Sequence, residues 1–159
     1  MPGSQRFPDQ VAKALRAAGW PFTQDRSAKI RAWREQLEAS AGFSMSSEAQ
    51  LALDEFGGLD IRDRGAGVDL ARVPFRLDPT VALGEEDRFA RASRLVGTDL
   101  YPLGDYEDGH ALIAIGRDGR VFLLMDRVWI AGPSLDEALI NLILGRGIQA
   151  VGGGEGFDG

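Results

Sequence analysis

The sequence has 159 residues, of which 44% are hydrophobic and 26% are charged, and it contains no cysteine. This length suits a single domain, which can bury enough apolar surface to fold without disulfides. The lack of cysteine excludes disulfides, thiolate metal sites and cysteine nucleophiles, and the single histidine, His110, excludes a histidine metal cluster. The formal net charge of −6 argues against nucleic-acid binding, which requires a basic face.

The charge is unevenly distributed along the chain. Residues 1–50 carry seven basic and five acidic side chains, whereas residues 51–159 carry 11 basic and 19 acidic ones. Any acidic binding surface therefore belongs to the second part. The N-terminus shows no apolar signal segment, and the apolar runs are far shorter than the roughly 20 residues that span a bilayer. We therefore expect a soluble cytoplasmic protein without a membrane partner.

Helical spacing of apolar residues predicts three helices before residue 58. The first ends at Gly19, because glycine readily adopts the left-handed conformation that terminates a helix. The second begins near Ser27, and the third begins at Ser46 or Ser47. The third helix ends at Gly57-Gly58, after which the periodicity changes.

Alternating apolar residues dominate the chain beyond residue 58. Residues 68–77 fit a strand or hairpin, residues 84–96 return to helical spacing, and residues 100–103 predict a short strand. The segment 104–109 that follows is predicted to be an acidic loop, since it contains three carboxylates and no basic residue.

The C-terminal part predicts a hairpin followed by a strand and a helix. The apolar runs 111–115 and 121–125 flank Asp118-Gly119, a dipeptide that favours a tight turn. A helix capped by Ser134 comes next. The whole order predicts an α+β fold with a central, mostly antiparallel sheet flanked by helices. We expect one domain over residues 1–147 and a flexible, glycine-rich tail over residues 148–159.

The residues that could carry chemistry have simpler structural explanations. Glu85, Glu86 and Asp87 occupy the first turn of a predicted helix, where carboxylates oppose the helix dipole. His110 lacks both a nucleophile motif and further metal ligands nearby in the sequence. We therefore predict no catalytic residue, metal or cofactor. An acid/base hydrolase stays open as an alternative if a single pocket holds two of Glu85, Glu86 and Asp108 within about 10 Å.

Several short blocks follow one another in an order that resembles a known superfamily. They are Gly19-Trp20, Ala32-Trp33-Arg34, Phe56-Gly57-Gly58-Leu59, Phe75-Arg76-Leu77-Asp78-Pro79, Gly84-Glu85-Glu86-Asp87-Arg88-Phe89, Tyr101-Pro102-Leu103-Gly104, Asp118-Gly119 and Gly132-Pro133-Ser134-Leu135-Asp136-Glu137-Ala138-Leu139. In their order and spacing from about residue 7 to residue 146, the chain resembles the SUKH superfamily, most closely its third subfamily of bacterial immunity proteins. No single block is specific on its own.

This resemblance implies a binding protein. Such an immunity protein binds and neutralises a cognate polymorphic toxin domain, often a nuclease or deaminase, and the family has no established catalytic residues. The superfamily also contains fungal cell-wall synthesis regulators, which imply an alternative function as an intracellular regulatory or scaffold module without a toxin partner.

The charge distribution and the resemblance together predict an acidic partner-binding surface. Its expected members are Asp60, Asp63, Asp105, Tyr106, Glu107 and Asp108. Such a surface can occupy the basic substrate groove of a nuclease, and complementary charge speeds association. Tyr106 would serve as an aromatic anchor. The alternative is that these carboxylates only keep exposed loops soluble.

Overall fold

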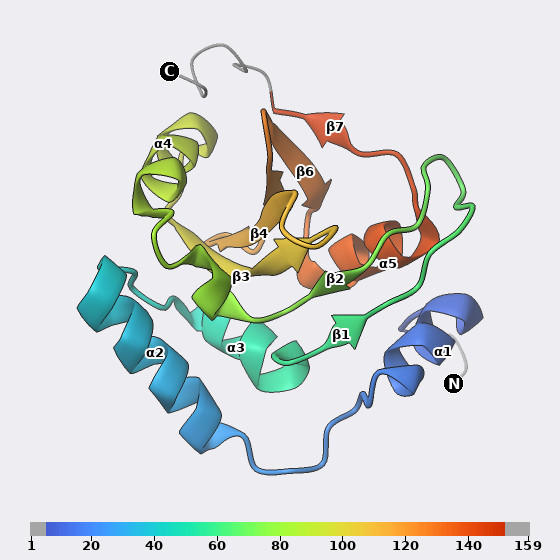
Figure 1. The fold of residues 1–159 in the computed structure, drawn as a ribbon, viewed down its shortest axis with the longest axis horizontal. Coiled ribbons are helices and arrows are strands. Elements are labelled where there is room, and N and C mark those ends of the chain that lie inside the picture. The colour runs from blue at the N-terminus through green and yellow to red at the C-terminus, as the bar shows by residue number, and fades with distance from the viewer. Residues whose placement is uncertain (1–5, 152–159) are drawn as a thin grey trace.

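The structure, a computed structural model, describes residues 6–151, which form helices packed around an antiparallel sheet (Figure 1). The helices are α1 (Asp9–Ala17), α2 (Ser27–Ala41), α3 (Ser47–Phe56), the 3-10 helix η2 (Pro79–Ala82), α4 (Glu86–Val96) and α5 (Leu135–Leu144). The strands are β1 (Asp60–Ile61), β2 (Phe75–Arg76), β3 (Leu100–Tyr106), β4 (Ala111–Gly116), β5 (Val121–Leu124), β6 (Val128–Gly132) and β7 (Gln149–Ala150). The α+β class predicted from the sequence is confirmed.

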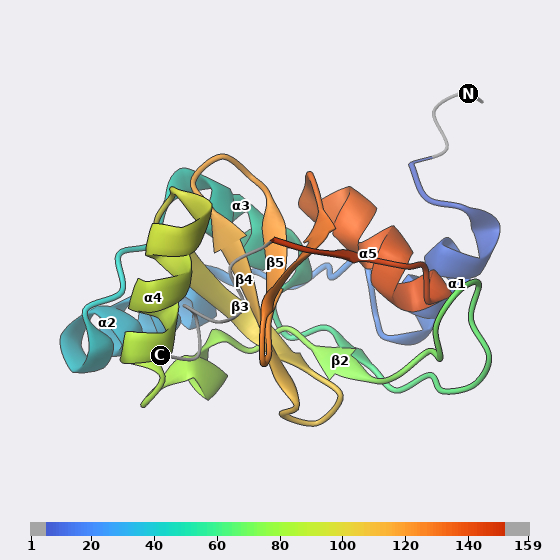
Figure 2. The ribbon, with the colours of Figure 1, turned by 90° about the horizontal axis from the view of Figure 1, so that it is seen from above.

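The sheet is a meander in which each strand pairs with its neighbour in the sequence. The seven strands lie in the order β1 to β7, and every pair is antiparallel. All residues of β4 and β5 are buried, so helices cover both faces of the sheet centre. Helix α4 lies on one side of the sheet and α3 on the other (Figure 1). The β3–β4 and β4–β5 turns lie at opposite ends of β4 (Figure 2).

Local sequence features determine where the helices begin and end, as expected. The Ser46 hydroxyl accepts a hydrogen bond from the Ala49 N–H at 3.1 Å and so caps α3. The Ser134 hydroxyl caps α5 in the same way, accepting from the Glu137 N–H at 3.3 Å. Gly145 ends α5 at φ 69°, in the left-handed region where glycine is favoured. These helix ends follow from residues adjacent in the sequence.

Two predicted strand boundaries are wrong. The strand or hairpin expected over 68–77 contains only β2, and residues 62–74 form a loop. The strand expected to end at residue 103 continues to Tyr106, so the first half of the predicted acidic loop belongs to β3. Within the tail that was expected to be flexible from residue 148, Gln149–Ala150 pair with β6. Residues 152–159 lie outside the described residues, and the division at residue 147 stays a prediction.

Two of the short sequence blocks meet at the end of α3. A Cβ on Gly57 would lie 2.7 Å from both the Trp33 ring and the Leu53 carbonyl oxygen, so a larger residue would require the indole and the backbone to shift. The Gly57 carbonyl accepts a hydrogen bond from the Arg26 guanidinium, which places a cation at the negative end of the helix. The Phe56-Gly57-Gly58-Leu59 block is therefore needed for packing.

Tyr101 offers a test of the buried core. Its side chain is 1% exposed, and its hydroxyl has no hydrogen-bond partner among the described residues. Burial raises the pKa of this hydroxyl to about 12. Removing an unsatisfied buried hydroxyl relieves a desolvation penalty. We therefore expect Tyr101→Phe to raise the free energy of unfolding at pH 7 by about 1 kcal/mol.

The same residue predicts how stability depends on alkaline pH. In the unfolded chain the tyrosine ionises near pH 10, whereas in the folded chain it stays neutral until its pKa of about 12. The unfolded state therefore binds fewer protons, and stability falls as pH rises from about 10 towards 12. Urea unfolding across this range should show a steeper fall for the wild type than for Tyr101→Phe. An equally steep fall of stability with pH in both proteins would contradict the raised pKa of Tyr101.

Candidate partner-binding surface

The structure brings the six residues predicted from the sequence to one edge of the sheet. Asp60 lies on β1, Asp105 and Tyr106 lie on β3, and Glu107 and Asp108 form the β3–β4 turn. Asp63 lies in the loop that connects β1 to β2. The two short strands β1 and β2 make this possible, because β1 pairs with β2 and β2 pairs with β3. We call this set of six residues the acidic edge.

Arg76 links the three strands of the acidic edge. On β2 it lies opposite Asp60 of β1 and opposite Asp105 of β3. Its Nε lies 3.0 Å from Asp105 Oδ1, and this hydrogen-bonded pair raises the pKa of the Arg76 guanidinium. Asp105 is only 6% exposed. The expectation that Asp105 is a loop residue open to a partner is therefore wrong, because it is a buried strand residue whose charge Arg76 compensates.

Arginines also neutralise the exposed carboxylates of this edge. Asp60 pairs with Arg62 at 2.9 Å, and Asp108 pairs with Arg62 at 3.2 Å and with Arg64 at 3.1 Å. Asp63 pairs with Arg72 at 3.7 Å. The β3–β4 turn has no basic residue in its own sequence, but the loop after β1 supplies the arginines. The acidic edge is thus a nearly neutral network of alternating charges.

The three carboxylates considered for hydrolase chemistry have structural partners, and that of Glu85 is Arg88 at 3.8 Å. Glu86 lines a cavity with Asp87 and Asp99, whereas Asp108 lines a different cavity with Asp60 and Asp105. Glu86 accepts a hydrogen bond from the Gly84 N–H at 2.9 Å, which lowers its pKa. Within residues 6–151, no three or more histidine, aspartate or glutamate side chains are grouped so that they could hold a metal ion.

Residues 62–74 form a loop that is fixed to the end of α5, and we call it the anchored loop. The Val68 N–H donates to the Leu144 carbonyl at 2.8 Å, and the Asp69 and Leu70 N–H groups donate to the Gly145 carbonyl. The Asp69 carboxylate accepts from the Gly147 N–H at 2.7 Å. With its backbone held, the loop exposes 64% of Val68 and 46% of Leu70. The sequence did not identify Val68 and Leu70 as exposed surface residues, because their alternating spacing was interpreted as a strand.

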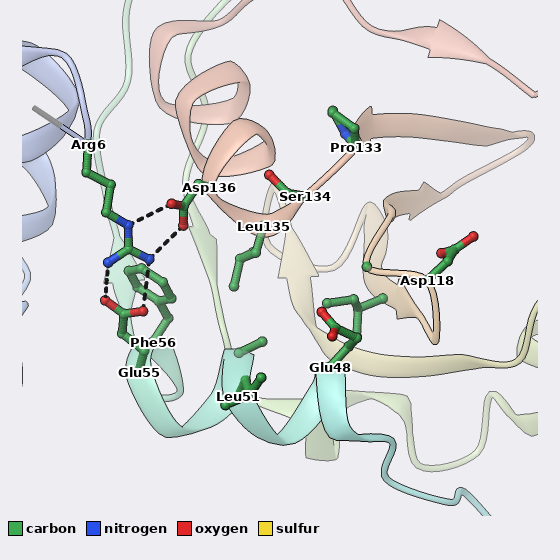
Figure 3. Close-up of a pocket in the computed structure, with 13 residues that line it drawn as sticks. Arg6, Glu48, Leu51, Glu55, Phe56, Asp118, Pro133, Ser134, Leu135 and Asp136 are labelled. Atoms are coloured by element: carbon green, nitrogen blue, oxygen red, sulfur yellow. Dashed lines mark hydrogen bonds and ion pairs between the residues drawn. The ribbon is translucent and has the colours of Figure 1, made fainter. Parts of the chain in front are cut away.

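A groove of about 250 Å³ lies at the end of β4 that is farther from the acidic edge. It is bounded by α3, the β4–β5 turn and the start of α5 (Figure 3). Leu51 projects from α3 with 63% of its surface exposed, and we call this feature the Leu51 groove. The buried stripe of α3 consists of Ala49, Ala52, Leu53 and Phe56. Leu51 is the large apolar residue that falls outside this stripe, and this deviation in the sequence could have identified it.

Arg6 closes one end of the Leu51 groove. Its guanidinium donates to both oxygens of Glu55 on α3, at 2.7 and 2.9 Å, and to both oxygens of Asp136 on α5, at 2.6 and 2.8 Å (Figure 3). It also lies over the Phe56 ring, 5.6 Å from the centroid. These hydrogen bonds raise the pKa of Arg6, so the guanidinium is a fixed positive charge.

None of the helices among the described residues is long and apolar enough to cross a membrane.

The family model described as SUKH-3 immunity protein matches residues 7–145, which include every α-helix of the structure and strands β1 to β6. No curated protein and no solved structure is similar enough to the chain to be matched. The matched range contains both the acidic edge and the Leu51 groove apart from Arg6. The chain belongs to the SUKH-3 immunity protein family.

Proposed function

We propose that the chain is a non-catalytic immunity protein that binds a cognate toxin domain and neutralises it in a stoichiometric complex. The toxin domain is a nuclease or deaminase with a basic surface. The observation that carries this proposal is the match to the SUKH-3 immunity protein family over residues 7–145. An immunity function implies a partner toxin, and binding is the function that the surfaces of this fold support best.

The anchored loop and the acidic edge form the proposed toxin-binding surface. Val68 and Leu70 are exposed apolar side chains on a backbone held by hydrogen bonds to α5, so little conformational entropy is lost when they are covered. The Arg64–Asp108 ion pair connects this loop to the β3–β4 turn, and Arg72 pairs with Asp63 within the loop. Apolar contacts surrounded by charged residues are the arrangement found at binding hot spots.

The members of the acidic edge then have different roles. Asp60, Asp63 and Asp108 have about half of their side-chain surface exposed, and with Tyr106 and Glu107 they form the polar rim of the surface. Asp105 positions β2 against β3. Because four arginines offset these carboxylates, the rim contributes specificity more than long-range attraction.

The proposal is tested by co-expression with the toxin encoded beside this chain's gene. The wild-type chain should restore growth and copurify with the toxin domain. The variant Val68→Ser/Leu70→Ser should bind the purified toxin domain at least about 10-fold more weakly, since a hot-spot side chain contributes more than about 1 kcal/mol. Glu35→Gln, at an exposed position on α2, serves as the control. Failure of a folded wild-type chain to bind or protect would contradict the proposed function.

A further inference from the structure

The Leu51 groove has an apolar floor within a rim of carboxylates. Leu51, Phe56, Ile115 and Leu135 contribute to its lining. Among the described residues, Leu51 is the exposed large hydrophobic side chain outside the anchored loop. An exposed apolar side chain inside a charged rim is typical of an interaction site. The groove is therefore a surface that a partner can cover.

The charge of the groove is distinctly negative. Its lining contains four carboxylates, from Glu48, Glu55, Asp118 and Asp136, and a single basic residue, Arg6. The cavity at the acidic edge, in contrast, is lined by three carboxylates and two arginines. A basic surface is therefore attracted more strongly to the Leu51 groove than to the acidic edge.

Arg6 shows how the rim receives a guanidinium. Two carboxylates, from different helices, each bind it through both oxygens, and an aromatic ring lies under it. At the opposite end of the groove, Glu48 and Asp118 present two further carboxylates (Figure 3). Arg120 Nε lies 2.7 Å from Asp118 Oδ2, whereas the Glu48 carboxylate makes no hydrogen bond or ion pair within residues 6–151.

We infer that the Leu51 groove is a second contact surface for the toxin and takes a segment in which an arginine stands beside an apolar side chain. The apolar side chain covers Leu51 and Leu135. The arginine pairs with Glu48, as Arg6 pairs with Glu55 at the other end. Charge complementarity selects this occupant, since the rim carries an excess of carboxylates over an apolar floor. The inference rests on the proposed function, because the toxin supplies the segment.

The experiment measures association and dissociation rates of the purified chain with the purified toxin domain, at low and at high salt. Leu51→Ser should weaken binding at least about 10-fold, mainly through faster dissociation. Glu48→Gln should slow association several-fold at low salt and reduce its salt dependence. The matched control Glu35→Gln removes a carboxylate from the exposed face of α2 and should leave both rates unchanged. Urea unfolding should confirm that all three surface variants keep the wild-type stability.

The outcomes separate this inference from the proposed function. Weaker binding by both Leu51→Ser and Glu48→Gln supports the inference. If the wild type binds and either variant equals it, the inference is overturned, while the proposed function stands. If the folded wild-type chain does not bind the toxin domain at all, the proposed function fails and the inference fails with it.

Discussion

Replacing Gly104 by alanine is expected to lower the free energy of unfolding by about 3 kcal/mol or more. Gly104 lies in β3, where the pairing register with β4 shifts. A Cβ at this position would overlap the Arg76 carbonyl oxygen and would lie 2.8 Å from the Leu77 Cα. Because both are backbone atoms, the clash cannot be relieved by a side-chain rotation, and β2 has to move away from β3.

Urea denaturation of the purified variant measures this effect. The midpoint should fall with little change in slope, since the surface exposed on unfolding stays nearly the same. Gly147→Ala is a matched control, because the nearest atom to a Cβ there is a side-chain oxygen of Asp69 at 3.4 Å. The control should change stability by less than about 0.5 kcal/mol. Equal stability of Gly104→Ala and Gly147→Ala would contradict the close contact between β2 and β3.

Replacing Arg76 by leucine is expected to lower the free energy of unfolding by about 2–3 kcal/mol. The substitution leaves the Asp105 carboxylate, with 9% of its side chain exposed, without its ion-pair partner. The effect is smaller than for a fully buried pair, because 48% of the Arg76 side chain is exposed. Arg62→Leu removes a partner of Asp60 and Asp108 at an exposed position and should lower stability much less than Arg76→Leu does.

A double-mutant cycle separates the ion pair from the loss of each side chain. Arg76→Leu/Asp105→Leu should be more stable than Arg76→Leu alone, because the double variant no longer buries an uncompensated charge. Urea unfolding of the four proteins at neutral pH gives the coupling energy. A double variant that is less stable than Arg76→Leu by the full effect of Asp105→Leu would show that the two residues are uncoupled.

Much of the fold could be predicted because the relevant information is local in the sequence. Ser46 and Ser134 begin helices through hydrogen bonds to residues three positions later. Asp118-Gly119 forms the turn between β4 and β5, with Gly119 at φ 92°. In each case a few adjacent residues determine the backbone conformation.

The anchored loop could not be predicted, because its structure depends on distant residues. Its alternating apolar residues have the spacing of a strand. The backbone N–H groups of Val68 and Leu70 instead donate hydrogen bonds to the end of α5, about 75 residues away. A Cβ on Gly67 would lie 2.8 Å from the Leu144 carbonyl oxygen, so the close approach requires glycine at this position. Nothing within the loop sequence indicates this partner.

The charge of the acidic edge was misjudged from the sequence, and its role in binding a partner stays a prediction. The six residues of the acidic edge do lie together, because β1, β2 and β3 are neighbours in the sheet. Their net charge was misjudged, since Arg62, Arg64 and Arg76 reach them from other segments. A count of charges along the chain cannot show which charges meet in space. The larger excess of carboxylates over basic residues occurs in the lining of the Leu51 groove.

We propose that this chain neutralises a toxin by binding it rather than by a reaction. The direct test is a titration of the toxin domain's catalytic activity with increasing amounts of the purified chain. For tight binding, activity should fall linearly and reach zero at one equivalent, and it should return when the complex is separated. Full inactivation by a small fraction of an equivalent, or undiminished activity at a large excess of folded chain, would contradict the claim.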